Sequence, residues 1–150
     1  MNAEKREQQP DVNRQLTLAR RPLGTPQRTD FKLLHSPLPE PADGEFLCRS
    51  ILLSIDPYMR GRMNDASSYT EPVALGAAMV GATVSEVIHS LNARFPVGSI
   101  VLNAGGWQDY SVSNGDGVVL IRTAATHTEG TEQTPLSWAL GVLGMPGLTA

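Results

Sequence analysis

Short stretches in which apolar and polar residues alternate occupy most of the chain. Such stretches, when turn-forming residues bound them, are typical of β-strands. The pattern predicts strands at residues 14–19, 31–34, 46–55, 79–90, 97–102, 105–112 and 118–121. Short strands at this spacing favour a small antiparallel barrel or sandwich.

The strand predicted at 46–55, FLCRSILLSI, has the strongest pattern. Its apolar residues concentrate towards its end, so we expect that end to enter the core. Three prolines between Ser36 and Gly44 predict irregular structure there, because proline removes a backbone donor and disfavours helix in the residue before it. Residues 79–90 are expected to form either a pair of strands or one bent strand with a kink at Gly81. Pro135, after a polar loop at 123–134, predicts the start of the first helix.

Composition supports a mainly β fold. The chain has 14 glycines and 11 prolines in 150 residues, which leaves little uninterrupted sequence for long helices. Its length suits one core, and we expect a domain over residues 14–150 that follows a disordered polar tail over residues 1–13. The apolar, glycine-punctuated end at 139–150 could be a helix that docks on the barrel, but we favour the interpretation that a second domain follows it.

Charge and hydropathy exclude several function classes. With 12 Lys and Arg against 15 Asp and Glu, the net charge is −3, which argues against a nucleic-acid partner or a polybasic membrane adaptor. No run of about 18 apolar residues predicts a transmembrane helix, and the first residues lack the apolar stretch of a signal peptide. We therefore predict a cytoplasmic protein without a membrane partner.

The metal-ligating and thiol residues are too few and too scattered to predict a metal site. The single cysteine, Cys48, excludes a disulfide within the chain and a zinc site with several thiolates. His35, His89 and His127 lie far apart, so we interpret them as solvated or structurally bonded. Cys48 lies in the middle of a predicted strand, where a small buried apolar side chain is the usual role.

The densest group of chemically active side chains follows the strand predicted at 46–55. SIDPYMRGRM is followed shortly by Ser67-Ser68-Tyr69, and it places Tyr58 and two arginines in a loop region where binding sites are common. From the residues alone, we favour packing roles for Tyr58 and Tyr69 and salt-bridged or solvated roles for Arg60 and Arg62.

Five blocks in register give the chain a specific resemblance: LLSIDPYMRGRM, SYTEP, MVGATVSEV, GWQDYSVS and LGVLGMPGLTA. From about Asn13 to Ala150, the chain resembles the N-terminal domain of zinc-independent NADP-dependent reductases. These enzymes belong to the medium-chain dehydrogenase/reductase superfamily, in the group that contains prostaglandin reductases and bacterial curcumin reductase. Val80 and Ser85 favour the curcumin-reductase branch, because many relatives have arginine and glycine there.

The resemblance implies a GroES-like, partly open β-barrel with short helices, normally followed by a Rossmann domain that binds NADPH. It implies an enzyme that transfers hydride from NADPH to the β-carbon of an α,β-unsaturated ketone or aldehyde. The full-length enzyme is expected to be a homodimer, and this chain is expected to be inactive alone. An alternative is a stand-alone β-barrel that acts as a binding or assembly module, with residues 139–150 as its docking surface.

The resemblance also implies site residues. Tyr58 takes a cleft-facing donor or stacking role, and Tyr69 takes a substrate-contact role with proton delivery as an option. The positions that approach the nicotinamide half of the cofactor are Pro57, Met145, Gly147 and Thr149. Residues 141, 144 and 147 form G-x-x-G-x-x-G, which is neither a dinucleotide fingerprint nor a P-loop. No metal ligand is implied.

Overall fold

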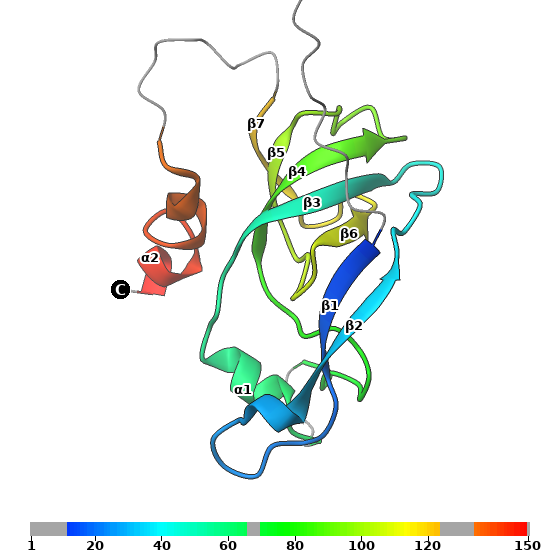
Figure 1. Cartoon of the computed structure of the whole chain (residues 1–150). Helices are drawn as coiled ribbons and strands as arrows, with labels where there is room; N and C mark the ends of the chain where they lie inside the picture. Colours follow the sequence, from blue (N-terminus) through cyan, green and yellow to red (C-terminus); the bar gives the residue numbers. More distant parts are fainter. Residues whose placement is uncertain (1–11, 66–69, 124–133, 150) are drawn as a thin grey trace, which may run out of the picture.

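The computed structural model describes residues 12–65, 70–123 and 134–149 of the chain. Within these ranges, seven strands form two antiparallel sheets (Figure 1). The smaller sheet pairs β1 (Val12–Leu18) with β2 (Phe31–Pro37). The larger sheet has the order β6-β3-β4-β5-β7. Its strands are β3 (Phe46–Leu53), β4 (Thr83–Ser90), β5 (Ile100–Asn103), β6 (Tyr110–Ser113) and β7 (Val119–Arg122).

The two sheets are joined where β1 crosses the segment before β6. The Leu16 amide donates to the Trp107 carbonyl at 2.9 Å. The side-chain amide of Asn13 donates to the Tyr110 carbonyl at 3.0 Å, and its oxygen accepts from the Tyr110 amide at 3.0 Å. Across the described residues no continuous ladder connects the two sheets, so the barrel is open there. The predicted mainly β, partly open architecture is confirmed.

The helical elements are short. They are the 3₁₀ helix η1 (Arg28–Asp30), α1 (Tyr58–Arg62), the 3₁₀ helix η3 (Leu136–Leu140) and α2 (Met145–Thr149). A helix does begin after Pro135, but it ends at Leu140. No helix in the described part of the chain is long and apolar enough to cross a membrane. η3 and α2 lie beside the larger sheet, near the end of β3 that leads into α1 (Figure 1).

Two expected strand boundaries are wrong. β1 begins at Val12, so the strand starts inside the expected tail, and Asn13 is buried because its side chain bonds to Tyr110. β2 continues through Ser36 to Pro37. Because β2 pairs only with β1, it is the edge of a two-stranded sheet, where proline is tolerated.

The burial of β3 is the reverse of the expected pattern. Its first residues, Phe46, Leu47 and Cys48, are buried, whereas Ile51 and Leu53 are exposed by 43% and 38%. The reason is the neighbouring strands. β6 pairs with β3 only as far as Arg49, so the second half of β3 is paired on one side alone.

Two apolar clusters form the core. One combines Phe46, Cys48, Val87, Phe95 and Val101, and its two phenylalanine rings stack at 4.6 Å between centroids. The other lies under α1 and is made by Leu18, Met59, Met63, Val73 and Met79.

Gly81 lies at the edge of the cluster under α1. It precedes β4 and does not kink a strand. A Cβ at this position would press against the side chains of Leu53, Met59 and Trp107. A larger residue would have to displace the ends of these side chains, which glycine avoids.

Candidate functional site

α1 carries the side chains that the sequence singled out. After β3, Pro57 enters helical backbone geometry with φ −57° and ψ −32°. The Met59 amide then donates to the Asp56 carbonyl, and the Arg60 amide to the Pro57 carbonyl, both at 3.1 Å. Because proline's φ is already fixed near the helical value, Asp-Pro starts the helix as soon as the strand ends.

Three side chains fix α1 against the rest of the domain. Met59 and Met63 are buried in the cluster beneath the helix. Arg60 donates to the carbonyls of Pro22 and Gly24 at 3.2 and 3.0 Å, and to the Asn64 side chain at 2.6 Å. Arg60 therefore has a structural role, in which hydrogen bonds to protein oxygens take the place of the expected salt bridge or solvation.

A pocket of about 460 Å³ opens beside α1. It is lined by Asp56, Pro57, Tyr58, Arg62, Thr70, Met145 and Pro146. The fold thus brings the start of α2 to the start of α1, although these segments lie far apart in the sequence. Three residues that the resemblance assigned to the site, Pro57, Tyr58 and Met145, line one pocket.

The other assigned residues are placed differently. Gly147 lies on α2 but is not among the described residues that line this pocket, and Thr149 is the last residue of α2. A Cβ on Gly147 would collide with the Val142 backbone, so close packing within the segment explains this glycine, as it also does Gly144 against Ala139. Tyr69 lies outside the described residues, as does His127.

The sequence interpretation missed Arg62 as a pocket residue. Tyr58 and Arg62 are four positions apart, a spacing that places side chains on the same face of a helix. Both line the pocket, whereas Arg60 turns away from it towards the loop at Pro22 and Gly24. The spacing of Tyr58 and Arg62 could have identified Arg62 as a pocket residue, but only if residues 58–62 had been predicted to form a helix.

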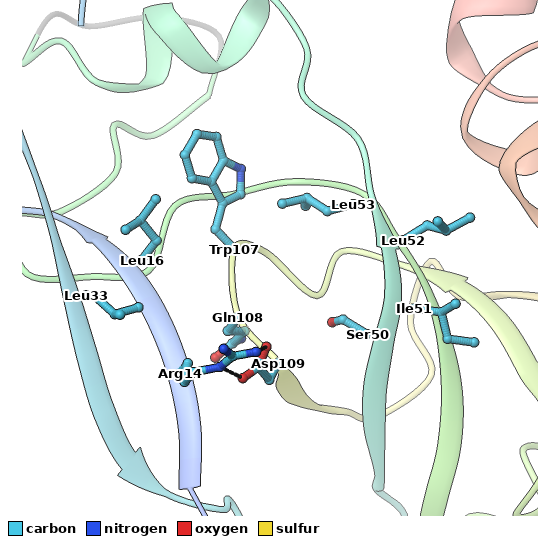
Figure 2. A pocket seen from close by; sticks show the side chains of 10 residues that line it. All are labelled: Arg14, Leu16, Leu33, Ser50, Ile51, Leu52, Leu53, Trp107, Gln108 and Asp109. Atoms are coloured by element: carbon cyan, nitrogen blue, oxygen red, sulfur yellow. Dashed lines mark hydrogen bonds and ion pairs between the residues drawn. The ribbon is translucent and has the colours of Figure 1, made fainter. Parts of the chain in front are cut away.

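A second pocket of about 390 Å³ lies between β1 and β3 (Figure 2). Figure 2 shows Trp107 at one end and an ion pair between Arg14 and Asp109 at the other, with 2.6 Å between Arg14 Nε and Asp109 Oδ2. Leucine and isoleucine side chains form much of the wall between them. Because the two charges are paired with each other, the α1 pocket is the better candidate for chemistry.

The remaining reactive groups lie away from the α1 pocket. Cys48 is buried in β3, and burial raises the pKa of its thiol to about 12, so it is not a nucleophile at neutral pH. His35 lies on β2 and His89 on β4. In the described ranges, no three His, Cys, Asp or Glu side chains cluster as a metal site would require.

Comparison with known proteins decides the family. Residues 14–121 match the family described as the N-terminal domain of oxidoreductase. The chain belongs to this family. The oxidoreductase domain is 47% identical over 143 residues to the NADPH-dependent curcumin reductase of Escherichia coli, a match that covers 95% of this chain and 39% of that protein. It is 41% identical over 134 residues to prostaglandin reductase 1 of Bos taurus, covering 89% of this chain and 37% of that protein.

A solved structure gives the same result. The oxidoreductase domain matches CurA from Vibrio vulnificus in complex with NADPH with a TM-score of 0.81 and 48% identity. That match covers 91% of this chain and 38% of the CurA chain. The resemblance to the N-terminal domain of these reductases is thereby confirmed, and the chain spans less than two fifths of the length of the CurA chain.

Proposed function

We propose that this oxidoreductase domain is the substrate-side domain of an enzyme that reduces the C=C bond of α,β-unsaturated ketones or aldehydes with NADPH. The observation that carries the proposal is the 47% identity over 95% of the chain to a protein named NADPH-dependent curcumin reductase. The convergence of Pro57, Tyr58 and Met145 on one pocket supports it. We also propose that the chain alone is inactive, since no dinucleotide fingerprint is present in its sequence.

The residues of the α1 pocket fit the nicotinamide end of NADPH. Pro57, Met145 and Pro146 offer apolar surface to a flat ring, and Tyr58 adds an aromatic face. Pro57 and Met145 would hold the ring from two segments, with Gly147 and Thr149 further along the same helix. When bound, NADPH supplies the hydride that reaches the β-carbon of the enone.

The domain's own residues orient the substrate and stabilise its oxygen. As hydride adds at the β-carbon, negative charge develops on the carbonyl oxygen, and a fixed O–H donor lowers the energy of that state. Tyr58 lines the pocket and packs on the methionine cluster beneath it, so its ring is held in place. We assign this donor role to Tyr58, and substrate contact with protonation of the α-carbon to Tyr69.

Removing each hydroxyl while keeping the ring tests these roles. In the full-length protein, Tyr58→Phe and Tyr69→Phe are each expected to lower kcat for an enone by roughly tenfold to a thousandfold, the range for loss of a single donor or proton-transfer group. The measurement is the steady-state rate of NADPH consumption. Unchanged kinetics in both variants would reduce the tyrosines to packing residues.

The alternative of a non-catalytic binding module has one observation in its favour. The segment from η3 to α2 exposes Trp138, Val142, Leu143 and Leu148 by 48%, 64%, 67% and 87%. Apolar side chains gathered on one segment mark a surface that another protein surface covers. The covering surface can belong either to a second domain or to a separate partner chain. Enone-dependent NADPH consumption by the full-length protein supports the enzyme, and its absence supports the module.

A further inference from the structure

Arg62 is a partly buried cation without a partner in the described part of the chain. Its guanidinium makes no ion pair or hydrogen bond there, and Nε is shielded from solvent without an acceptor. Its backbone carbonyl accepts from the Val73 amide at 2.8 Å. A buried donor of a charged group that is left unsatisfied destabilises the fold, so such a group needs a ligand or a structural explanation.

The neighbouring arginines show that the shortage of acceptors is specific to Arg62. Arg60 is satisfied by the carbonyls of Pro22 and Gly24. Arg21 donates to the carbonyls of Met63 and Val73 at 3.1 and 2.7 Å and forms an ion pair with Asp65 at 3.6 Å. The carbonyls and the carboxylate that these two arginines contact are therefore engaged by cations other than Arg62.

Arg62 forms part of the wall of the α1 pocket. It lines the same pocket as Tyr58, one helical turn away on the same face of α1. Asp56 also lines the pocket, yet it forms no ion pair with Arg62 within the described residues. The pocket, at about 460 Å³, has the size of a small-molecule site.

We propose that Arg62 is a specificity-determining residue that binds a carboxylate on the substrate. The guanidinium presents planar donors that match a carboxylate, and the apolar residues of the same pocket strengthen such a bond because they lower the local dielectric constant. Tyr58 then holds the enone oxygen while Arg62 holds the distal anionic group, so the domain prefers acidic enones to neutral ones. This inference rests on the proposed function.

The test compares two substrates that share one enone in the full-length protein: 4-carboxybenzylideneacetone and its methyl ester. Hydrogen bonds to charged groups contribute about 1.5–3 kcal/mol, which corresponds to a change of roughly 10- to 100-fold. Arg62→Gln is therefore expected to raise KM for the acid by that factor and to leave KM for the ester within about threefold. Arg62→Lys, which keeps the charge, should recover part of the loss.

Arg60→Gln is the matched control, because it removes a guanidinium two positions away that bonds only to the protein. We expect it to affect acid and ester equally. An equal change for both substrates in Arg62→Gln would overturn the proposal and make Arg62 structural. An increase in KM confined to NADPH would also overturn it, because the bound anion would then be a cofactor phosphate.

Failure of this inference is distinguishable from failure of the proposed function. If the wild-type protein reduces neither compound, the enone-reductase function fails and the role of Arg62 falls with it. If it reduces both compounds without preferring the acid, only the role of Arg62 is overturned. Should Arg62→Gln not fold, the wild-type preference decides. A preference for the acid that weakens as salt rises supports the proposal, and a salt-independent preference contradicts it.

Discussion

Met59 anchors α1, and replacing it with alanine should loosen both the helix and the pocket it carries. The side chain is 2% exposed and packs with Leu18, Met63, Val73 and Met79. Met59→Ala removes Cγ, Sδ and Cε and leaves a cavity, a change that costs about 2–5 kcal/mol in buried cores. Because α1 has five residues and lies at the end of the barrel, it can partly collapse into the cavity, so we expect about 3 kcal/mol.

Urea denaturation of the chain measures this loss. The midpoint should fall by roughly 1–3 M for a domain whose m-value in urea lies in the usual range of about 1–3 kcal/mol/M. Met59→Leu keeps most of the volume and should cost less than about 1.5 kcal/mol, which makes it the matched control. A loss below about 1 kcal/mol for Met59→Ala would refute the claim that this methionine holds the helix.

Two further predictions concern the fold. Asn13→Ala should destabilise the chain by about 2 kcal/mol, because it leaves the buried amide and carbonyl of Tyr110 without partners. The measurement is hydrogen exchange of the Tyr110 amide, which should be faster in the variant than in the wild type. The Gln27 amide and then Arg20 hold the pKa of Asp30 below its usual value. The stability that Asp30 adds is therefore present above its unfolded pKa and lost as pH falls through the lowered folded pKa. The melting temperatures of wild type and Asp30→Asn should converge in acid, and a constant gap would contradict the linkage.

The strands were predictable because alternation is a local property of the sequence. Every predicted strand segment overlaps a strand of the structure, and only their ends moved, as at Val12 and Pro37. The burial of β3 was not predictable, because it depends on β6 ending its pairing at Arg49, a contact between residues far apart in sequence. The alternation of apolar and polar residues thus identified the strands, but it did not show which strands pair with one another.

Part of the site was predictable from the family resemblance. The resemblance named Pro57, Tyr58 and Met145, which the fold brings to one pocket. The different roles of Arg60 and Arg62 could not be read from RGR, because they depend on the loop at Pro22 and Gly24, which takes up one guanidinium only. Gly147 could be matched to a cofactor site by resemblance, whereas the structure explains it by a backbone contact within its own segment.

The most direct test of the central claim is the fate of the hydride in the full-length protein. NADPH labelled with deuterium at C4 of the nicotinamide is mixed with benzylideneacetone, and the product is analysed by NMR. The account predicts the saturated ketone with deuterium on the β-carbon. An allylic alcohol with deuterium on the former carbonyl carbon, or no consumption of NADPH, would contradict it.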